Sequence, residues 1–482
     1  MDVDTVLATL QERVQELQGT VPGHMPGKVV ELDNFLVLES RYLKQVQEGF
    51  RGVEWERVVP LPADRLKKYE DLPEPVDREQ IRAMLSKLVV LKLNGGLGTS
   101  MGCSFPKNAI EIRPGTNFFD CFVDHIKDLN DAYDVDIPLV LMNSPATESM
   151  TEELLPKYQG VIRILCINQQ LFPRIDAETM LPVAKSADPA QTQSDEWYPP
   201  GHGDVYDTLL QSDAYRTLME EGKTILFVSN GDNLGATVDL RILNMMHQES
   251  ELEFFCEVVA KTLRDVKGGT IIEYDNRLKL LELAQVPADK VSEFTSIDKF
   301  EVFNTNSLWF RLEKLRPNLD LDIIVNRKNL RGKPIIQLET AMGAAISQFT
   351  HTVSVRVPRE RFAPVKTCSD LLLIMSDFYS LTKGVLTPNP ELPGSLPTIT
   401  LGPEFTFVQD FLARFPHGIP SMRAIQDLTI AGDVMFDADV VLKGKVEIIA
   451  AAGASLRVPA GTVLDHQRMA IDGDGTITTV PL

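Results

Sequence analysis

The sequence predicts an α/β fold built on a mostly parallel, Rossmann-like sheet. Between residues 88 and 382, short apolar runs alternate with helical patterns, an order typical of parallel strands covered by helices on both faces. The preceding residues have helical spacing, and the following residues form short β-branched segments between glycines. We therefore expect a helical N-terminal segment at 1–86, an α/β domain at 87–382 and a β domain at 383–482.

Apolar periodicity places the individual elements in order along the chain. The expected strands lie at 88–93, 137–142, 161–167, 224–229, 254–260 and 353–357. The expected helices lie at 6–17, 36–46, 118–129, 147–155, 205–221, 239–249, 338–349, 368–381 and 407–415. Between the last two strands, residues 271–283 predict a hairpin that turns at Asp275-Asn276.

Composition and net charge limit the classes of function that the protein can have. The 482 residues carry a net charge of −20, which argues against a nucleic-acid partner or an anionic membrane surface. We expect no signal peptide and no membrane span, since no apolar run approaches about 18 residues. The five cysteines are scattered without a C-x-x-C pair, so we expect reduced thiols and a cytoplasmic location.

The strand at 88–93 opens into a glycine cluster, Asn94-Gly95-Gly96-Leu97-Gly98. Glycines let backbone amides approach a phosphate closely, and Lys107 adds a positive charge a few residues later. The spacing to Gly102 is one residue too long for a dinucleotide fingerprint, and no G-K-[ST] follows. A tight turn without a ligand remains open, but the surrounding polar residues favour a triphosphate.

Three further polar motifs begin where apolar runs end, and ligands of parallel sheets lie at the carboxyl ends of strands. Gln169 follows the strand ending at Ile167, and its amide offers a donor and an acceptor side by side. His202 lies between two glycines and can donate to a phosphate or sugar oxygen. Asp232 suits Mg²⁺ held on triphosphate oxygens, with an Asx-turn as the alternative. We expect these loops to meet in one pocket.

The segment LNGGLGTSMG, followed by Pro106-Lys107, resembles the nucleotide-binding loop of the eukaryotic-type UDP-glucose pyrophosphorylases (UTP:glucose-1-phosphate uridylyltransferases). The segments NQQ with PRI, PPGHGD and FNTN are similar to other motifs of that family. Phe105 and Asn108 stand where the family commonly has glycine and serine. The resemblance covers most of the chain and is strongest over 88–367.

This resemblance implies a Mg²⁺-dependent nucleotidyltransferase that converts UTP and glucose 1-phosphate into UDP-glucose and pyrophosphate. It implies that Lys107 and Lys366 are catalytic and contact phosphates, with Lys366 pointing inward. The nucleotide-binding residues that it implies are Leu93, Asn94, Gly95, Gly96, Gly98, Gln169, Gly201 and Asp232. Asp232 would also be the metal ligand. The sugar- and ribose-binding residues that it implies are His202, Asn230, Asn233, Gly269, Glu282, Asn304 and Asn306.

Two questions stay open at this point. The C-terminal segments resemble the left-handed β-helix of sugar nucleotidyltransferases, with a β-sandwich as the alternative, and a homo-oligomer formed through this domain is a further expectation. For function, the alternatives are a UDP-sugar pyrophosphorylase of broader specificity, the UDP-N-acetylhexosamine enzyme and a non-catalytic nucleotide-sugar binding protein. The acetylhexosamine enzyme usually has an arginine in its loop, where this chain has Thr99-Ser100.

Overall fold

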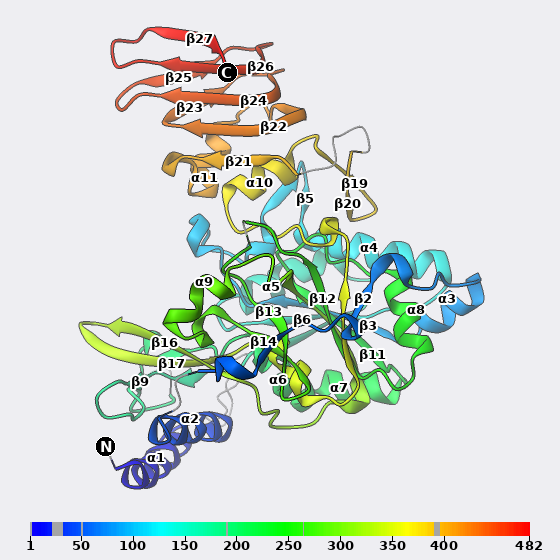
Figure 1. Cartoon of the computed structure of the whole chain (residues 1–482), viewed down its shortest axis with the longest axis vertical. Helices are drawn as coiled ribbons and strands as arrows, with labels where there is room; N and C mark the ends of the chain where they lie inside the picture. Colours follow the sequence, from blue (N-terminus) through cyan, green and yellow to red (C-terminus); the bar gives the residue numbers. More distant parts are fainter. Residues whose placement is uncertain (1, 22–31, 50–51, 189–190, 264, 390–395) are drawn as a thin grey trace. The chain divides into compact units, whose positions relative to one another are not determined.

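The computed structural model describes residues 2–21, 32–49, 52–188, 191–263, 265–389 and 396–482, and the elements are labelled in Figure 1. The chain forms two compact units. Unit 1 comprises Met1–Gly95, Leu129–Asn230 and Val238–Arg359, and unit 2 comprises Gly96–Asp128, Gly231–Thr237 and Glu360–Leu482. These units differ from the ranges expected from sequence because the chain passes between them several times. No helix of the described residues is long and apolar enough to cross a membrane.

Unit 1 is organised around an eight-stranded sheet of order β2-β18-β12-β15-β11-β3-β6-β7. Its strands are β2 (Leu66–Lys68), β18 (Thr352–Arg356), β12 (Phe254–Ala260), β15 (Val302–Arg311), β11 (Ile225–Asn230), β3 (Leu88–Asn94), β6 (Leu139–Asn143) and β7 (Ile164–Asn168). Every neighbouring pair is parallel except the two made by β15. The sheet is therefore mixed and mostly parallel, and the six predicted strands all belong to it.

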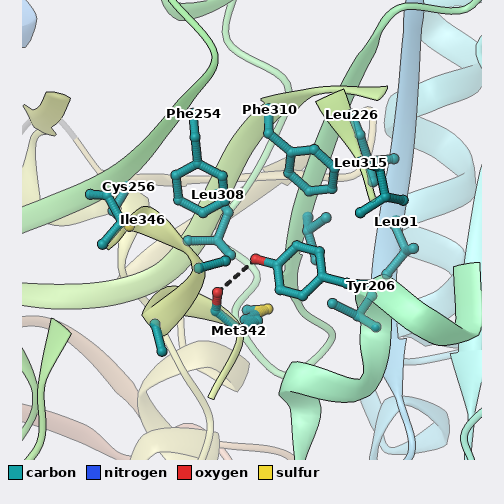
Figure 2. Packing of buried hydrophobic residues seen from close by; sticks show 14 of the residues in the cluster. Leu91, Tyr206, Leu226, Phe254, Cys256, Leu308, Phe310, Leu315, Met342 and Ile346 are labelled. Carbon is teal, nitrogen blue, oxygen red and sulfur yellow. Dashed lines mark hydrogen bonds between the residues drawn. The ribbon is translucent and has the colours of Figure 1, made fainter. Parts of the chain in front are cut away.

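Helices and aromatic side chains cover this sheet. The helices of unit 1 that follow the sheet strands, or lead into them, are α3 (Arg78–Leu85), α5 (Glu148–Leu154), α6 (Val205–Gln211), α7 (Asp213–Glu220) and α8 (Leu240–Gln248). Figure 2 shows Tyr206 of α6 among Phe254, Phe310 and Leu91, with its hydroxyl donating to the Met342 carbonyl at 2.6 Å. Because β3 is buried along nearly its whole length, its apolar run is continuous, as a strand covered on both faces requires.

The N-terminal segment is partly helical, as predicted, with α1 (Val3–Gln18) and α2 (Leu32–Gln47). Their apolar faces share a buried cluster with Phe172, Tyr198 and Leu338. The segment also supplies strands, which the sequence analysis did not predict: β1 (Val58–Pro60) pairs with β13, and β2 joins the main sheet. The predicted hairpin is confirmed as β13 (Thr270–Tyr274) and β14 (Arg277–Leu281). Asp275 and Asn276 form its turn with φ values of 53° and 60°.

The helix predicted at 338–349 is wrong. Residues Lys333–Thr340 form β17, which pairs with β16 (Ile323–Leu330), and a 3₁₀ helix, η12 (Met342–Gln348), follows. The predicted helix at 205–221 is interrupted at Ser212, which is extended and caps α7 through the Tyr215 amide. The helix predicted at 368–381 is α10 (Cys368–Met375), and the chain turns at Ser376 into β19 (Tyr379–Thr382).

Unit 2 combines loop segments from earlier in the chain with the C-terminal residues. Its elements include β4 (Glu111–Arg113), β5 (Thr116–Asn117), β20 (Val385–Pro388) and α11 (Val408–Ala413), and residues up to Asp128 of α4 (Phe118–Tyr133) also belong to it. The glycine loop packs on the later part: a Cβ on Gly102 would lie 2.7 Å from the Phe407 ring. The Cys368 thiol donates to the Thr406 carbonyl at 3.4 Å.

The C-terminal strands stack in register as two ladders. The larger ladder is β21 (Thr398–Leu401), β22 (Ser421–Ala431), β24 (Val441–Ala450), β26 (Val463–Ile471) and β27 (Ile477–Pro481), all parallel except for β27. The smaller ladder pairs β23 (Asp433–Phe436) with β25 (Ser455–Val458) in parallel. Alternate apolar residues are buried, as in β24, where Val446 and Ile448 are inaccessible. The ladders confirm the predicted β character of this region.

Candidate active site

The carboxyl ends of β3, β6 and β7 lie side by side in unit 1, so the polar residues that follow them are neighbours. Asn94, buried at the end of β3, donates to Asn143 Oδ1 at 2.7 Å and to Thr151 Oγ1 at 2.9 Å. The Gly95 carbonyl accepts a hydrogen bond from Ser144 Oγ at 2.7 Å. These contacts hold the start of the glycine loop against the end of β6.

Gln169 follows β7 and is 6% exposed. A Cβ on Gly95 would lie 3.2 Å from its Oε1, so the glycine leaves room for this amide. The Nε2 group of Gln169 donates to the Gly201 carbonyl at 2.6 Å. Gly201 has a φ of +85°, and a Cβ there would lie 2.5 Å from the Thr340 carbonyl oxygen. Only glycine therefore fits the backbone that presents this carbonyl to Gln169.

His202 follows directly, and its tautomer is set by a backbone contact. Its Nδ1 accepts a hydrogen bond from the Met342 amide at 3.0 Å, so the proton of the neutral ring lies on Nε2. Burial lowers the pKa of His202 to about 4. The imidazole is thus a neutral Nε2–H donor near neutral pH, which suits the predicted bond to a phosphate or sugar oxygen.

The residues predicted to bind the sugar gather at another part of unit 1. The Asn304 amide donates to the Gly269 carbonyl at 2.9 Å, and Asn304 Nδ2 donates to Asn306 Oδ1 at 3.0 Å. A Cβ on Gly269 would lie 2.5 Å from Glu282 Oε1, so the carboxylate lies against this glycine. Asn304 and Asn306 do not lie in a regular stretch of β15. A bulge interrupts the pairing of β15 with β12 there, and Asn306 has a φ of 57°.

The segment after β17 joins these two groups of residues. Met342 bonds His202, and a Cβ on the adjacent Gly343 would lie 3.0 Å from Asn304 Nδ2. Direct contacts therefore connect Gln169, Gly201, His202, Asn304 and Asn306 in one continuous series that passes through Met342 and Gly343. Asn230 ends β11, where it is in register with Leu93 of β3. Within unit 1 the structure thus brings together the residues predicted for the base and the sugar.

Unit 2 contains the predicted cation and carboxylate. Lys107 Nζ lies 2.8 Å from Asp232 Oδ2, and the two side chains are 15% and 20% exposed. The Lys107 amide donates to the Gly96 carbonyl at 3.2 Å. A Cβ on Gly98 would lie 3.7 Å from Lys107 Cγ, so the glycine turn contacts the stem of this lysine.

Asn233 has a structural role in unit 2. Its Oδ1 accepts from the Ala363 amide at 2.9 Å, its Nδ2 donates to the Arg361 carbonyl at 3.2 Å, and the residue is 1% exposed. The Val365 amide donates to the Asp232 carbonyl at 3.0 Å. The amide of Asn233, expected to meet a substrate hydroxyl, is therefore used to join the loop after Asp232 to residues 361–365.

Lys366 differs from its expected orientation, because its side chain is exposed. Val365 takes the buried position with no accessible surface, so the next side chain points away from that core. Asp370 accepts from the amides of Lys366 and Thr367, at 2.9 and 2.8 Å, and thereby fixes this segment at the start of α10. The side chain of Lys366 is therefore exposed, whereas its backbone is hydrogen-bonded to Asp370.

Comparison with known proteins identifies the family. The family model described as UTP--glucose-1-phosphate uridylyltransferase matches residues 32–443. The chain belongs to this family. A probable UTP--glucose-1-phosphate uridylyltransferase of Schizosaccharomyces pombe is 46% identical over 474 residues, which cover 95% of this chain and 92% of the relative. The uridylyltransferase of Hordeum vulgare is 46% identical over 446 residues, which cover 91% of this chain and 92% of the relative.

Solved structures give the same result. A mutant of UDP-glucose pyrophosphorylase from Leishmania major has a TM-score of 0.83 and 33% identity, covering 96% of this chain and 99% of its own. Another mutant of that enzyme, in complex with UDP-glucose, has a TM-score of 0.82 and 32% identity with the same coverage. The mixed α/β architecture of this chain is therefore that of the uridylyltransferase family.

Sequence reasoning missed several groups that shape this uridylyltransferase site. Met342 acts through its backbone amide and Gly201 through its carbonyl, which no side-chain pattern can indicate. Gln170 and Asp204 lie within the motifs NQQ and PPGHGD, so their polar character was a usable signal. Asp204 lies at the N-terminus of α6, but its side chain makes no capping bond to that helix. It accepts from the Gln170 amide at 2.8 Å instead.

Proposed function

We propose that this chain transfers the uridylyl group of UTP to glucose 1-phosphate, releasing pyrophosphate in a reversible, Mg²⁺-dependent reaction. Its membership of the uridylyltransferase family supports the reaction. The observation that carries it is the continuous series Gln169–Gly201–His202–Asn304–Asn306 in unit 1. It offers an amide for a base, an imidazole donor for a phosphate, and paired amides for sugar hydroxyls.

The chemistry needs no general base. Glucose 1-phosphate is already ionised at neutral pH, and its phosphate oxygen attacks the α-phosphorus of UTP in line with the departing pyrophosphate. The protein has to align two polyanions and stabilise the charge that develops on the transferred and leaving groups. Lys107, Lys366 and the backbone amides of residues 95–98 are the groups that we assign to this task.

Asp232 is the residue that we assign to Mg²⁺. In the described part of the chain no three histidine, cysteine or acidic residues gather as a metal site, so a fully protein-made cage is not formed there. One carboxylate together with phosphate oxygens and water is the set that Mg²⁺ prefers, and Asp232 fits it. When bound, the ion would supply positive charge to the phosphate oxygens. Lys107, already paired with this carboxylate, would supply charge to the same oxygens.

Sugar choice is assigned to Glu282, Asn304 and Asn306. A carboxylate accepts from sugar hydroxyls, whereas an asparagine amide can both donate and accept. The left-handed backbone of Asn306 at the bulge fixes where its amide lies relative to Asn304. These contacts support a preference for glucose 1-phosphate over sugars that differ in the orientation of a hydroxyl.

We further propose that the C-terminal ladders wind as a left-handed β-helix and that a second copy binds at their end. The in-register parallel ladders support the β-helix, and the support for the second copy is the end strand β27 with the residue after it, where Ile477, Val480 and Leu482 are about half exposed. We also propose a cytoplasmic location, since all five cysteines are free thiols. Light scattering of the full chain and fractionation of cells test these two assignments.

A pyrophosphate-release assay tests the main proposal. The full chain is incubated with UTP and, in turn, glucose, galactose and N-acetylglucosamine 1-phosphates, with Mg²⁺ or with a chelator. We expect release with glucose 1-phosphate, much less with the other sugars, and none with the chelator. Equal rates for all three sugars would favour the broader UDP-sugar pyrophosphorylase, and no release with any of them would favour a binding protein.

A further inference from the structure

Asp204 connects the two loops that carry Gln169 and His202. Its Oδ2 accepts from the Gln170 amide at 2.8 Å and from Thr208 Oγ1 at 3.0 Å, and the residue is 6% exposed. Its own amide donates to the Gly201 carbonyl at 3.3 Å. The same carbonyl accepts from Gln169 Nε2. Two hydrogen bonds therefore join Gln169 to Gly201 and Gln170 to Asp204.

The Gly201 contact decides which way the Gln169 amide points. Nε2 carries two hydrogens, and one of them is directed at the Gly201 carbonyl. The other hydrogen and Oε1 lie on the remaining edge of the amide, where they can pair with O4 and N3–H of uracil. Cytosine presents the opposite pattern, an N4–H donor and an N3 acceptor. To match it the amide would have to turn over, which would place Oε1 against the Gly201 carbonyl oxygen.

We propose that Asp204 is a positioning residue that sets the preference of this enzyme for uracil over cytosine nucleotides. By holding the Gln170 amide and the turn at Gly201 together, its carboxylate keeps the Gly201 carbonyl within reach of Gln169. Gln170 itself is buried, and its Oε1 accepts from Asn34 of α2 at 3.1 Å. The hydrogen bonds of Gln170 thus fix the position of the neighbouring Gln169, and we assign no nucleotide contact to Gln170 itself. This inference rests on the proposed reading of uracil by Gln169.

The chain offers a conservative variant and a matched control. Asp204→Asn retains an acceptor oxygen for the Gln170 amide, whereas Asp204→Ala removes both acceptor atoms. Asp207→Ala is the control, because Asp207 lies on α6, the helix that Asp204 precedes, but accepts from the Asn318 amide at 3.2 Å and bonds neither loop residue. Thr208→Val removes only one of the two bonds to Asp204 Oδ2 and serves where Asp204→Ala does not fold.

The experiment measures kcat/KM of the full chain with UTP and with CTP, with the melting temperature of each variant. We expect Asp204→Ala to lower the UTP/CTP ratio roughly tenfold, as the loss of one orienting hydrogen bond implies. Thr208→Val should lower the ratio by a smaller factor, Asp204→Asn should recover most of it, and Asp207→Ala should leave it unchanged. A merely structural role would lower both kcat/KM values together and leave the ratio constant.

Two results would overturn the inference in distinguishable ways. An unchanged UTP/CTP ratio in Asp204→Ala, with Gln169→Ala lowering the ratio, would show that Gln169 reads the base without help from Asp204. An unchanged ratio in Gln169→Ala as well would show that this amide does not read the base, and the inference would fail with that assignment. Both results are separate from failure of the proposed reaction, which is an unmutated chain that releases no pyrophosphate from UTP.

Discussion

Lys107 Nζ lies 2.8 Å from Asp232 Oδ2, and both side chains are mostly buried. These two residues are 125 positions apart in the chain, yet they belong to the same compact unit. The two side chains are still 15% and 20% exposed, so each charge keeps some contact with solvent. Under the proposed function, both partners are the charges that a nucleoside triphosphate with its magnesium ion would engage, so substrate binding would exchange this ion pair for others.

Replacement of Lys107 tests the catalytic assignment. We expect Lys107→Ala to lower kcat by about 10²–10³, because one fixed positive contact to the developing charge is lost. The melting temperature should change little, because a partly exposed ion pair contributes little to stability. Pyrophosphate release and thermal unfolding measure the two effects. Lys443→Ala, at an exposed position of β24, is the control, and a near-normal rate in Lys107→Ala would remove our central assignment.

Replacement of Asp232 tests the metal assignment. Asp232→Asn keeps the size of the side chain but removes the charge that attracts Mg²⁺, so we expect a large loss of kcat and a higher Mg²⁺ concentration for half-maximal activity. A loss of about 10²-fold is the scale for one electrostatic contact. A titration of activity against Mg²⁺ for both proteins measures it. If the half-maximal Mg²⁺ concentration is the same in both, the ion is held elsewhere.

Substitution of Gly96 distinguishes a role of the glycine loop in phosphate binding from a role in folding. A Cβ on Gly96 would meet nothing within 4 Å, and its φ is not in the left-handed region, so Gly96→Ala should fold normally. The added methyl group would hold a phosphate away from the loop amides, and we expect KM for UTP to rise about tenfold. Gly473→Ala, which is equally unobstructed, is the matched control. Equal KM values in the two variants would place the triphosphate away from this loop.

His202 predicts a defined pH dependence of stability. Its pKa is about 4 in the folded chain and 6.5 ordinarily, so between these values the unfolded chain binds a proton that the folded chain does not. Stability therefore rises with pH in this window and no longer depends on His202 above it. His202→Asn should remove that part of the slope. Denaturant midpoints at about pH 5 and pH 7.5 measure it, and identical slopes would contradict the prediction.

Glu39 predicts that stability falls as pH rises, which is the opposite of the dependence predicted for His202. Its carboxyl group is inaccessible and has no hydrogen-bond partner within the described residues, and burial raises its pKa well above the ordinary value. As pH rises above about 4.5, the unfolded chain loses a proton that the folded chain keeps, so stability falls. Glu39→Leu should therefore stabilise the fold by about 1–3 kcal/mol, and more at pH 8 than at pH 5.

Thermal unfolding at the two pH values measures this effect. Glu12→Leu, at an exposed position of α1, is the control and should show no gain that grows with pH. A Glu39→Leu chain that is less stable than the unmutated chain at both pH values would indicate that the carboxyl group has a stabilising role.

The sequence predicts six of the eight strands of the main sheet, because each of the six is a continuous apolar run between turn residues; β2 and β15 are not among them. It does not predict the antiparallel direction of β15, since that depends on pairing with β11 and β12, both distant in the chain. The segment 335–338 fits a helix or a strand by its apolar residues alone. The segment is a strand because it pairs with β16, and local periodicity contains no information about that partner.

In the candidate site too, some features can be predicted from the sequence and others cannot. Gln169 and Asp232 are identifiable because polar residues follow an apolar run, and His202 is identifiable because it lies between two glycines. The orientation of Lys366 depends on which of two neighbouring side chains the core accepts, and Val365 is the one that is buried. The protonated nitrogen of His202 depends on the Met342 amide, 140 residues away. Such details come from tertiary contacts of the backbone, which the side-chain pattern does not encode.

The discontinuous composition of unit 2 has a practical consequence for shortened versions of this enzyme. The glycine loop lies against Phe407, and Cys368 bonds Thr406, so residues after 396 contact segments encoded earlier in the chain. A truncation before residue 396 would retain Lys107, Asp232 and Lys366 and still deprive them of their scaffold. Reporter fusions and tags therefore belong at the termini, and the tail cannot be trimmed as a dispensable appendage.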